Sequence, residues 1–352
     1  MDEKEKNAEM AGITVIPDLA SYMQAVIEQL EANKKRSAVH TYTYALKSVT
    51  EFYGGKGTPM PVDEVFTPGR LKEYEEWMKL ERERKKGREP KGLSLNTIST
   101  YMRDLKAVYN RLADEKVLPY NSKLFDDVYT KVESQTKRAL KAEQMNTLLY
   151  ADMDELPEGV RCALAYFLLM FLFRGMPFID LAYLRKQDVK GNSIVYSRHK
   201  TGRQMTVRIP KEAAGLMEEF KNKNTDSIYL FPILDEESVK EEQNRNNKNR
   251  KKDKELHLYY LRALRNFNRK LEAITMLLLP GVKLSSYTPR HTWATLAFHS
   301  GMSIGIISKA LGHSSIKVTE TYLKPFENEK VDAANDKLIM TIAGSNKDKK
   351  VA

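Results

Sequence analysis

Six polar residues in the second half of the chain have side chains that can act together on a phosphate ester. In chain order they are Arg174, Lys200, Tyr287, Arg290, His313 and Tyr322. Two guanidinium groups can clamp phosphate oxygens, because the planar fork matches their geometry and stays charged at any working pH. Lysine and imidazole can supply a proton or a hydrogen bond, and a tyrosine hydroxyl can attack phosphorus to form a covalent ester. These types in this order predict phosphoryl-transfer chemistry.

The elements that position these residues are indicated by two local patterns. The apolar run CALAYFLLMFLF at 162–173 predicts a buried helix beside Arg174, and the run is far shorter than the roughly 20 residues of a bilayer span. The segments NSIVYSR and QMTVRIP, joined by HKTGR, predict a β-hairpin with Lys200 at its tip. Helical patterns return at 211–220 and 256–277.

The N-terminal part is expected to be nearly all helical over 13–135, with Ser94 or Asn96 capping its last long helix. Four or five helices predict a small domain. The polar, basic stretch at 131–142 is typical of a linker, with an exposed helix end as the alternative. We therefore expect a helical domain at 13–130, a linker at 131–142, a second domain at 143–330 and a tail at 331–352.

The charge balance favours an acidic partner. The 352 residues include 58 Lys and Arg against 47 Asp and Glu, a formal net charge of +11. Nucleic acid is the leading candidate, with an anionic membrane surface or an acidic protein as alternatives. The single cysteine, Cys162, excludes an intramolecular disulfide and a multi-cysteine zinc site. The charged N-terminus MDEKEKNAEM predicts no secretory signal.

The C-terminal motifs TPRHTWATLAFHSGMSI and LGHSSIKVTETY resemble those of the tyrosine recombinase (phage integrase) family. The resemblance implies a fold that is mainly α with a small β-hairpin or sheet. It places a helical, SAM-like core DNA-binding domain before a mixed α+β catalytic domain. It further implies a site-specific recombinase that works without metal or cofactor. Such an enzyme cleaves DNA through a 3′-phosphotyrosyl link and a free 5′-hydroxyl, and then rejoins it.

Four residues match the family motifs directly. The resemblance makes Tyr322 the nucleophile, Arg290 the second arginine and His313 the downstream histidine. It makes Lys200 the hairpin lysine that protonates the leaving 5′-oxygen.

Two positions depart from the family pattern. Tyr287 stands where a histidine usually precedes Arg290, and a phenol can donate a hydrogen bond but is a poor base near neutral pH. The neighbouring His291 is expected to support packing more than to replace it. In GMPFIDLAYL, Pro177 stands where the first arginine belongs, and Arg174 lies one helical turn earlier as its expected replacement. The alternative is that Arg174 only ends a helix. The displaced arrangement resembles a subgroup found on conjugative elements and invertible DNA segments.

Candidate DNA contacts lie mainly in the helical N-terminal part, and most would touch phosphate. They are Lys34, Lys35, Arg36, Thr41, Tyr42, Lys47, Asn96, Thr97, Thr100, Arg103 and Lys106, with Arg203 and His291 from the second domain. The two domains are expected to grip opposite sides of double-stranded DNA. Helical periodicity begins near residue 16, so no additional arm-binding domain is expected.

The assembly and location follow from the same resemblance. The apolar stripe in the tail predicts a helix that docks on its own domain or, as the family implies, on a neighbouring protomer of a homotetramer on paired DNA sites. A cytoplasmic protein acting at the bacterial nucleoid is expected. Two alternatives stay open: a type IB topoisomerase-like relaxase, and a non-catalytic DNA-binding protein of the same fold.

Overall fold

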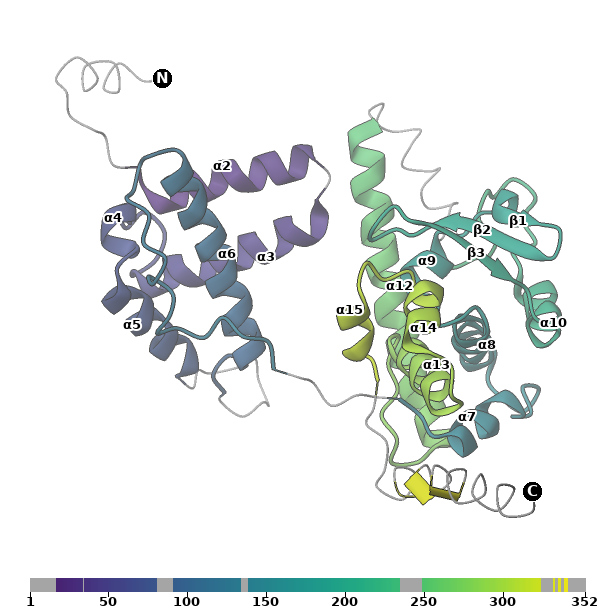
Figure 1. Cartoon of the computed structure of the whole chain (residues 1–352). Coiled ribbons are helices and arrows are strands. Elements are labelled where there is room, and N and C mark those ends of the chain that lie inside the picture. Colours follow the sequence, from purple (N-terminus) through teal and green to yellow (C-terminus); the bar gives the residue numbers. More distant parts are fainter. Residues whose placement is uncertain are drawn as a thin grey trace. The chain divides into compact units, whose positions relative to one another are not determined.

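The computed structural model describes residues 17–33, 35–80, 91–133, 139–234 and 249–323, with scattered positions of the tail (Figure 1). The chain divides into two compact units, Met1–Gln135 and Thr136–Ala352, which are described separately. The expected fold class is confirmed, because the described residues are mainly helical with one small sheet. None of the helices within these ranges is both long enough and apolar enough to cross a membrane.

The first unit is a group of helices whose apolar faces share one core. Its described helices are α2 (Leu19–Ala32), α3 (Arg36–Phe52), α4 (Val62–Val65), α5 (Pro68–Lys79) and α6 (Leu95–Asp114). The side chain of Asp18 caps α2, and that of Ser94 caps α6 as predicted. Ile98 and Leu105 of α6 are fully buried in this core.

The segment after α6 corrects the prediction that 13–135 is nearly all helical. Residues 115–133 form turns, bends and irregular backbone. The Tyr109 hydroxyl donates to the Pro119 carbonyl at 2.7 Å and accepts from the Asn121 N–H at 2.6 Å. Helix α6 ends before this segment, where Lys116 has a left-handed φ of 59° and the Val117 N–H donates to the Leu112 carbonyl at 2.8 Å. Pro119 then lacks the N–H that a further helical turn needs. The buried apolar residues of the segment are Leu124, Phe125 and Val128.

The second unit packs its helices around α8. Its described elements are α7 (Ala142–Leu149), α8 (Glu158–Leu172), α9 (Phe178–Ala182), the 3-10 turn η1 (Lys186–Asp188), β1 (Val189–Lys190), β2 (Ser193–Ser197), β3 (Gln204–Arg208), α10 (Lys211–Phe220), α12 (Asn249–Leu278), α13 (Thr288–His299), α14 (Ile304–Leu311) and α15 (Ile316–Glu320). Every residue from Ala163 to Met170 is buried, and α8 contacts α7, α9, α10, α12 and α13. A helix that is apolar on all sides needs such enclosure, so the predicted buried helix is confirmed.

The sheet of the second unit contains the predicted hairpin. Its antiparallel strands follow the order β1-β2-β3, with Ile194 opposite Val207 and Tyr196 opposite Met205. These apolar residues face the core, because side chains alternate across a strand. The short strand β1 was not predicted, since two residues are too few to show a periodic pattern.

Candidate active site

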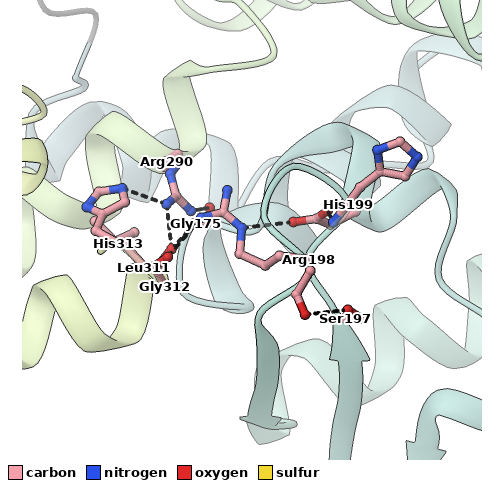
Figure 2. A network of polar contacts seen from close by, with 10 residues as sticks. Gly175, Ser197, Arg198, His199, Arg290, Leu311, Gly312 and His313 are labelled. Carbon is pink, nitrogen blue, oxygen red and sulfur yellow. Dashed lines mark hydrogen bonds and ion pairs between the residues drawn. The ribbon is translucent and has the colours of Figure 1, made fainter. Parts of the chain in front are cut away.

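Arg290 lies at the centre of the site, in the first turn of α13, and is only 3% exposed. Its Nη1 donates to the carbonyl of Gly175 at 2.9 Å. Its Nη2 donates to the carbonyl of Leu311 at 2.6 Å and to Nε2 of His313 at 2.9 Å (Figure 2). Arg290 therefore joins its own helix, α13, to two other segments: the loop after α8, and the end of α14 with the turn that follows it.

The loop after α8 approaches Arg290 through an unusual backbone turn. Arg174 and Gly175 both have left-handed φ angles, of 59° and 68°. This conformation costs a non-glycine residue about 1–2 kcal/mol, and such strain is concentrated at functional sites. A Cβ on Gly175 would lie 3.0 Å from the Cα of Arg290, so any other residue here would crowd this backbone atom as well as strain the left-handed turn. The half-buried side chain of Arg174 has no hydrogen bond or ion pair with the described residues, while Pro177 caps α9 and offers no charge.

Lys200 lies exposed in the turn between β2 and β3, as predicted. The turn is closed by two backbone bonds of 2.8 Å, from the Arg198 N–H to the Arg203 carbonyl and from the Gly202 N–H to the Arg198 carbonyl. Gly202 has a φ of 69°, which the turn requires. After burial and the charges of Arg290 and Arg198, the charge of Lys200 also lowers the pKa of His313.

A buried ion pair that the sequence reasoning did not single out lies beside Arg290. Arg198 and Asp180 are 7% and 4% exposed, and Arg198 Nε lies 3.4 Å from Asp180 Oδ2. Arg198 Nη1 also donates to the Leu311 carbonyl at 2.9 Å (Figure 2). Burial raises the pKa of Asp180, opposed by the His199 N–H and the charge of Arg198. The alternation of side chains along the strand could have identified Arg198. Tyr196 points into the core, and Arg198 lies two positions later, on the same face.

His313 follows Gly312, the left-handed residue that ends α14, and is buried. Its Nε2 lies 2.9 Å from Arg290 Nη2, and its Nδ1 lies 2.9 Å from Thr319 Oγ1. A guanidinium only donates, so Nε2 accepts and we assign the ring proton to Nδ1. Burial, followed by the positive charges led by Arg290, lowers the pKa of His313 to about 4. The imidazole is therefore neutral at neutral pH.

Tyr322 packs its ring into this cluster. The ring centroid lies 5.0 Å from that of His313 and 4.7 Å from that of His291. The guanidinium carbon of Arg290 lies 5.4 Å from the same ring centroid. The Tyr322 carbonyl accepts from Thr295 Oγ1 at 3.3 Å. The half-buried phenol is thus held among the residues with which it was predicted to act.

Three other predicted residues lie at the edge of this cluster. Tyr287 is the N-cap of α13 and is 61% exposed. His291 packs on Tyr322, with its Nδ1 3.5 Å from the Tyr322 carbonyl, in the supporting position that was expected. Arg203 Nη1 donates to the His313 carbonyl at 2.7 Å. The side chains of His291 and Arg203, both predicted to contact DNA, thus contact the site itself.

The other candidate DNA contacts lie on or beside α3 and α6, which contact each other. Asn96 has partners within the chain, because its Nδ2 donates to the Glu133 carbonyl at 3.3 Å and its Oδ1 accepts from the Glu133 N–H at 2.9 Å. Lys34 lies outside the described residues. The half-buried or exposed candidates are Lys35, Arg36, Thr41, Tyr42, Lys47, Thr97, Thr100, Arg103 and Lys106.

The buried part of the site carries more positive than negative charge. The two guanidiniums of Arg198 and Arg290 are opposed by the single carboxylate of Asp180. Nε of Arg290 is buried without a hydrogen-bond partner among the described atoms. An uncompensated buried charge and an unpaired donor are costly, so the site is suited to an anion. Within the described ranges, no three His, Cys, Asp or Glu side chains gather to hold a metal ion.

Models of two known protein families match the sequence of this chain. The phage integrase family model matches residues 138–329, and the phage integrase SAM-like domain model matches residues 18–126. Tyrosine recombinase XerA of Pyrococcus furiosus is 28% identical over 156 residues, which cover 43% of this chain and 46% of that protein. A tyrosine recombinase of Pseudothermotoga lettingae is 38% identical over 53 residues, 15% of this chain and 18% of that protein. The chain thus matches less than half the length of these curated relatives.

Solved structures share the fold at low sequence identity. The Tn1549 transposon integrase in complex with transposon right end DNA has a TM-score of 0.58 at 17% identity, covering 89% of this chain and 99% of that one. A lambda integrase dimer bound to a COC′ core site has a TM-score of 0.56 at 14% identity, covering 91% and 81%. Since the phage integrase model alone matches more than half of the sequence, the chain belongs to the phage integrase family of tyrosine recombinases.

Proposed function

We propose that this protein is a site-specific DNA recombinase that cleaves and rejoins double-stranded DNA through a 3′-phosphotyrosyl intermediate. The observation that carries the proposal is the packing of Tyr322 against a buried cluster with an excess of positive charge. A phosphodiester supplies the missing negative charge and an acceptor for Nε of Arg290. Family membership and the fold shared with DNA-bound integrases support the same activity.

In the proposed reaction, Tyr322 Oη attacks the scissile phosphorus and the bond from phosphorus to the 5′-oxygen breaks. Once Arg290 Nη2 turns its hydrogen bond from His313 Nε2 to the phosphate, Nε2 accepts the phenol proton. Lys200 Nζ donates a proton to the leaving 5′-oxygen. Arg174 and Arg290 hold the non-bridging oxygens and stabilise the charge that develops there. Attack by the 5′-hydroxyl of a partner strand then restores a phosphodiester and releases Tyr322.

His313 is suited to accept a proton only once DNA is bound. In the free protein its pKa is lowered to about 4, by burial first and then by the charges of Arg290, Arg198 and Lys200. A phosphate placed among these cations offsets their repulsion of a proton, which raises the pKa of the imidazole. The exposed Tyr287, at the helix end that carries Arg290, would donate a hydrogen bond to a phosphate oxygen instead of acting as a base.

Domain roles and assembly extend the proposal. Residues 13–130 would form the core DNA-binding domain, 131–142 the linker, 143–330 the catalytic domain and 331–352 a tail exchanged between protomers of a homotetramer on paired sites. The SAM-like match supports the first assignment. The displaced Arg174 favours an integrase or invertase of a mobile or invertible element, acting in the cytoplasm at the bacterial nucleoid.

The target site and the activity are tested together. Sequencing the DNA fragments that become covalently attached to the protein in its source genome locates the site, and a nicked duplex of that site then traps the intermediate. We expect an adduct with wild-type protein in EDTA, and none with Tyr322→Phe, which binds DNA normally. An adduct from Tyr322→Phe removes Tyr322 as the nucleophile, and no adduct from wild type favours a non-catalytic DNA-binding protein. Relaxation of supercoiled plasmid without exchange between two sites identifies a relaxase.

The role of Arg174 has its own test. Arg174→Lys keeps the charge but loses the bidentate fork, so we expect adduct formation to fall about 100-fold or more while DNA affinity stays within about twofold. Near-normal cleavage by this variant contradicts the assignment of Arg174 as the first arginine.

A further inference from the structure

The loop that carries Lys200 is attached to the rest of the site by the arginines at its two ends. Arg198 and Arg203 are paired by the backbone bond that closes the turn. Arg198 Nη1 donates to the Leu311 carbonyl at 2.9 Å, and Arg203 Nη1 donates to the His313 carbonyl at 2.7 Å. Both arginines therefore donate to backbone carbonyls of the short segment from Leu311, the end of α14, to His313.

This segment is a suitable anchor for guanidinium groups. The last carbonyls of a helix lack intrahelical partners and lie at the negative end of the helix dipole. The Leu311 carbonyl accepts from Arg198 and from Arg290, so one oxygen sets the positions of both side chains. Gly312 is tightly packed against the hairpin, because a Cβ there would lie 2.8 Å from Sδ of Met205 and 3.0 Å from Cδ of Arg198.

Arg198 is buried at a position where a purely structural residue would more often be apolar. Asp180 compensates its charge, and the same carboxylate accepts from the N–H of His199, the residue before Lys200. The side chain of Arg198 thus connects the backbone beside Lys200 with Arg290 and with the carbonyls next to His313. Figure 2 shows these contacts converging from the hairpin and the end of α14.

We propose that Arg198 is a positioning residue for Lys200. Its contacts hold the hairpin tip where the lysine can protonate the leaving 5′-oxygen. Arg203 provides a second, exposed attachment with the same effect. This inference rests on the proposed recombinase function. It assigns Arg198 no direct contact with the reacting phosphate.

The test compares two DNA substrates that differ in their need for a proton. One has the natural scissile phosphodiester, and the other has sulfur in place of the bridging 5′-oxygen. A thiolate leaves without protonation because a thiol is far more acidic than an alcohol. We expect Arg198→Gln to cleave the natural substrate about 100-fold more slowly, since general acid catalysis and its alignment are worth this much. The sulfur substrate is expected to be cleaved within about threefold of the wild-type rate.

Four further variants complete the experiment. Lys200→Ala is likewise expected to cleave the natural substrate slowly and to recover on the sulfur substrate. Arg290→Lys is expected to cleave both substrates slowly. Arg208→Gln removes a charge from the outward face of the same hairpin and is expected to cleave both substrates normally. Arg203 is exposed, so Arg203→Gln leaves no buried charge without a partner, whereas Arg198→Gln removes the partner of the Asp180 carboxylate. Arg203→Gln therefore tests the attachment even where Arg198→Gln lowers the thermal stability. We expect Arg203→Gln to cleave the natural substrate about tenfold more slowly than wild type and to recover its cleavage rate on the sulfur substrate.

Two results overturn the inference while the proposed function stands. In one, folded Arg198→Gln and Arg203→Gln cleave both substrates as wild type does. In the other, they fail on both substrates, so that their defect lies in holding the phosphate and not in protonating the leaving oxygen. If wild-type protein forms no adduct with either substrate, the proposed function itself fails and the inference fails with it.

Discussion

Replacing Gly175 with alanine tests how closely the loop after α8 sets the position of Arg290. Gly175 has a φ of 68°, and an added Cβ would lie 3.0 Å from Cα and 3.3 Å from Cγ of Arg290. Gly191 is a matched control, because its φ is 58° and an added Cβ there meets nothing within 4 Å. Both substitutions impose the left-handed strain of about 1–2 kcal/mol, but only Gly175→Ala also crowds a backbone atom.

The expected magnitudes follow from this difference. Gly191→Ala is expected to lower the free energy of unfolding by about 1–2 kcal/mol. Gly175→Ala adds an overpacking cost of about 1–3 kcal/mol, for a total of about 2–5 kcal/mol. Because the crowded atom belongs to the backbone of Arg290, we also expect its guanidinium to shift and adduct formation to fall about 100-fold.

The assay needs a signal from the second unit alone. The chain has two tryptophans, and Trp293 packs against the apolar cluster that contains Ile307 and Leu311 in the second unit. In a Trp77→Phe background, urea unfolding followed by Trp293 fluorescence reports that unit, and trapping on the nicked substrate reports cleavage. Equal stability and equal cleavage for Gly175→Ala and Gly191→Ala refute the argument that contact with this loop positions Arg290.

Further predictions concern pH, capping and salt. The pKa of His313 is lowered from 6.5 to about 4 in the folded protein, so the unfolded chain binds the extra proton first as the pH falls. We expect the free energy of unfolding, measured with urea, to decrease by about 2 kcal/mol between pH 7 and pH 5 because of this group. His313→Gln is expected to lack this decrease. Asp18→Ala removes the cap of α2 and is expected to destabilise the first unit by about 1–2 kcal/mol, measured by Trp77 fluorescence, with cleavage by folded protein unchanged. DNA affinity is expected to fall steeply with salt in a binding titration, and a flat log–log dependence argues against phosphate contacts by both domains.

Much of the fold was readable because its signals are local. The unbroken apolar run of α8 and the alternation along β2 and β3 arise from contacts between near neighbours in sequence. These patterns placed the buried helix and the hairpin with Lys200 at its tip. The irregular segment 115–133 was misread as helical, because its conformation depends on the Tyr109 hydroxyl and not on its own periodicity.

By itself, the sequence determined which chemical groups are present and in what order, and hence the family and the proposed chemistry. Only the tertiary structure decided how Arg198, Asp180 and Gly175 surround Arg290, and which nitrogen of His313 carries the proton. The physical reason is separation along the chain. The Leu311 carbonyl lies 113 residues from Arg198, and no local pattern encodes a hydrogen bond over that distance. Burial then converts these contacts into shifted pKa values and an excess of positive charge suited to a phosphate.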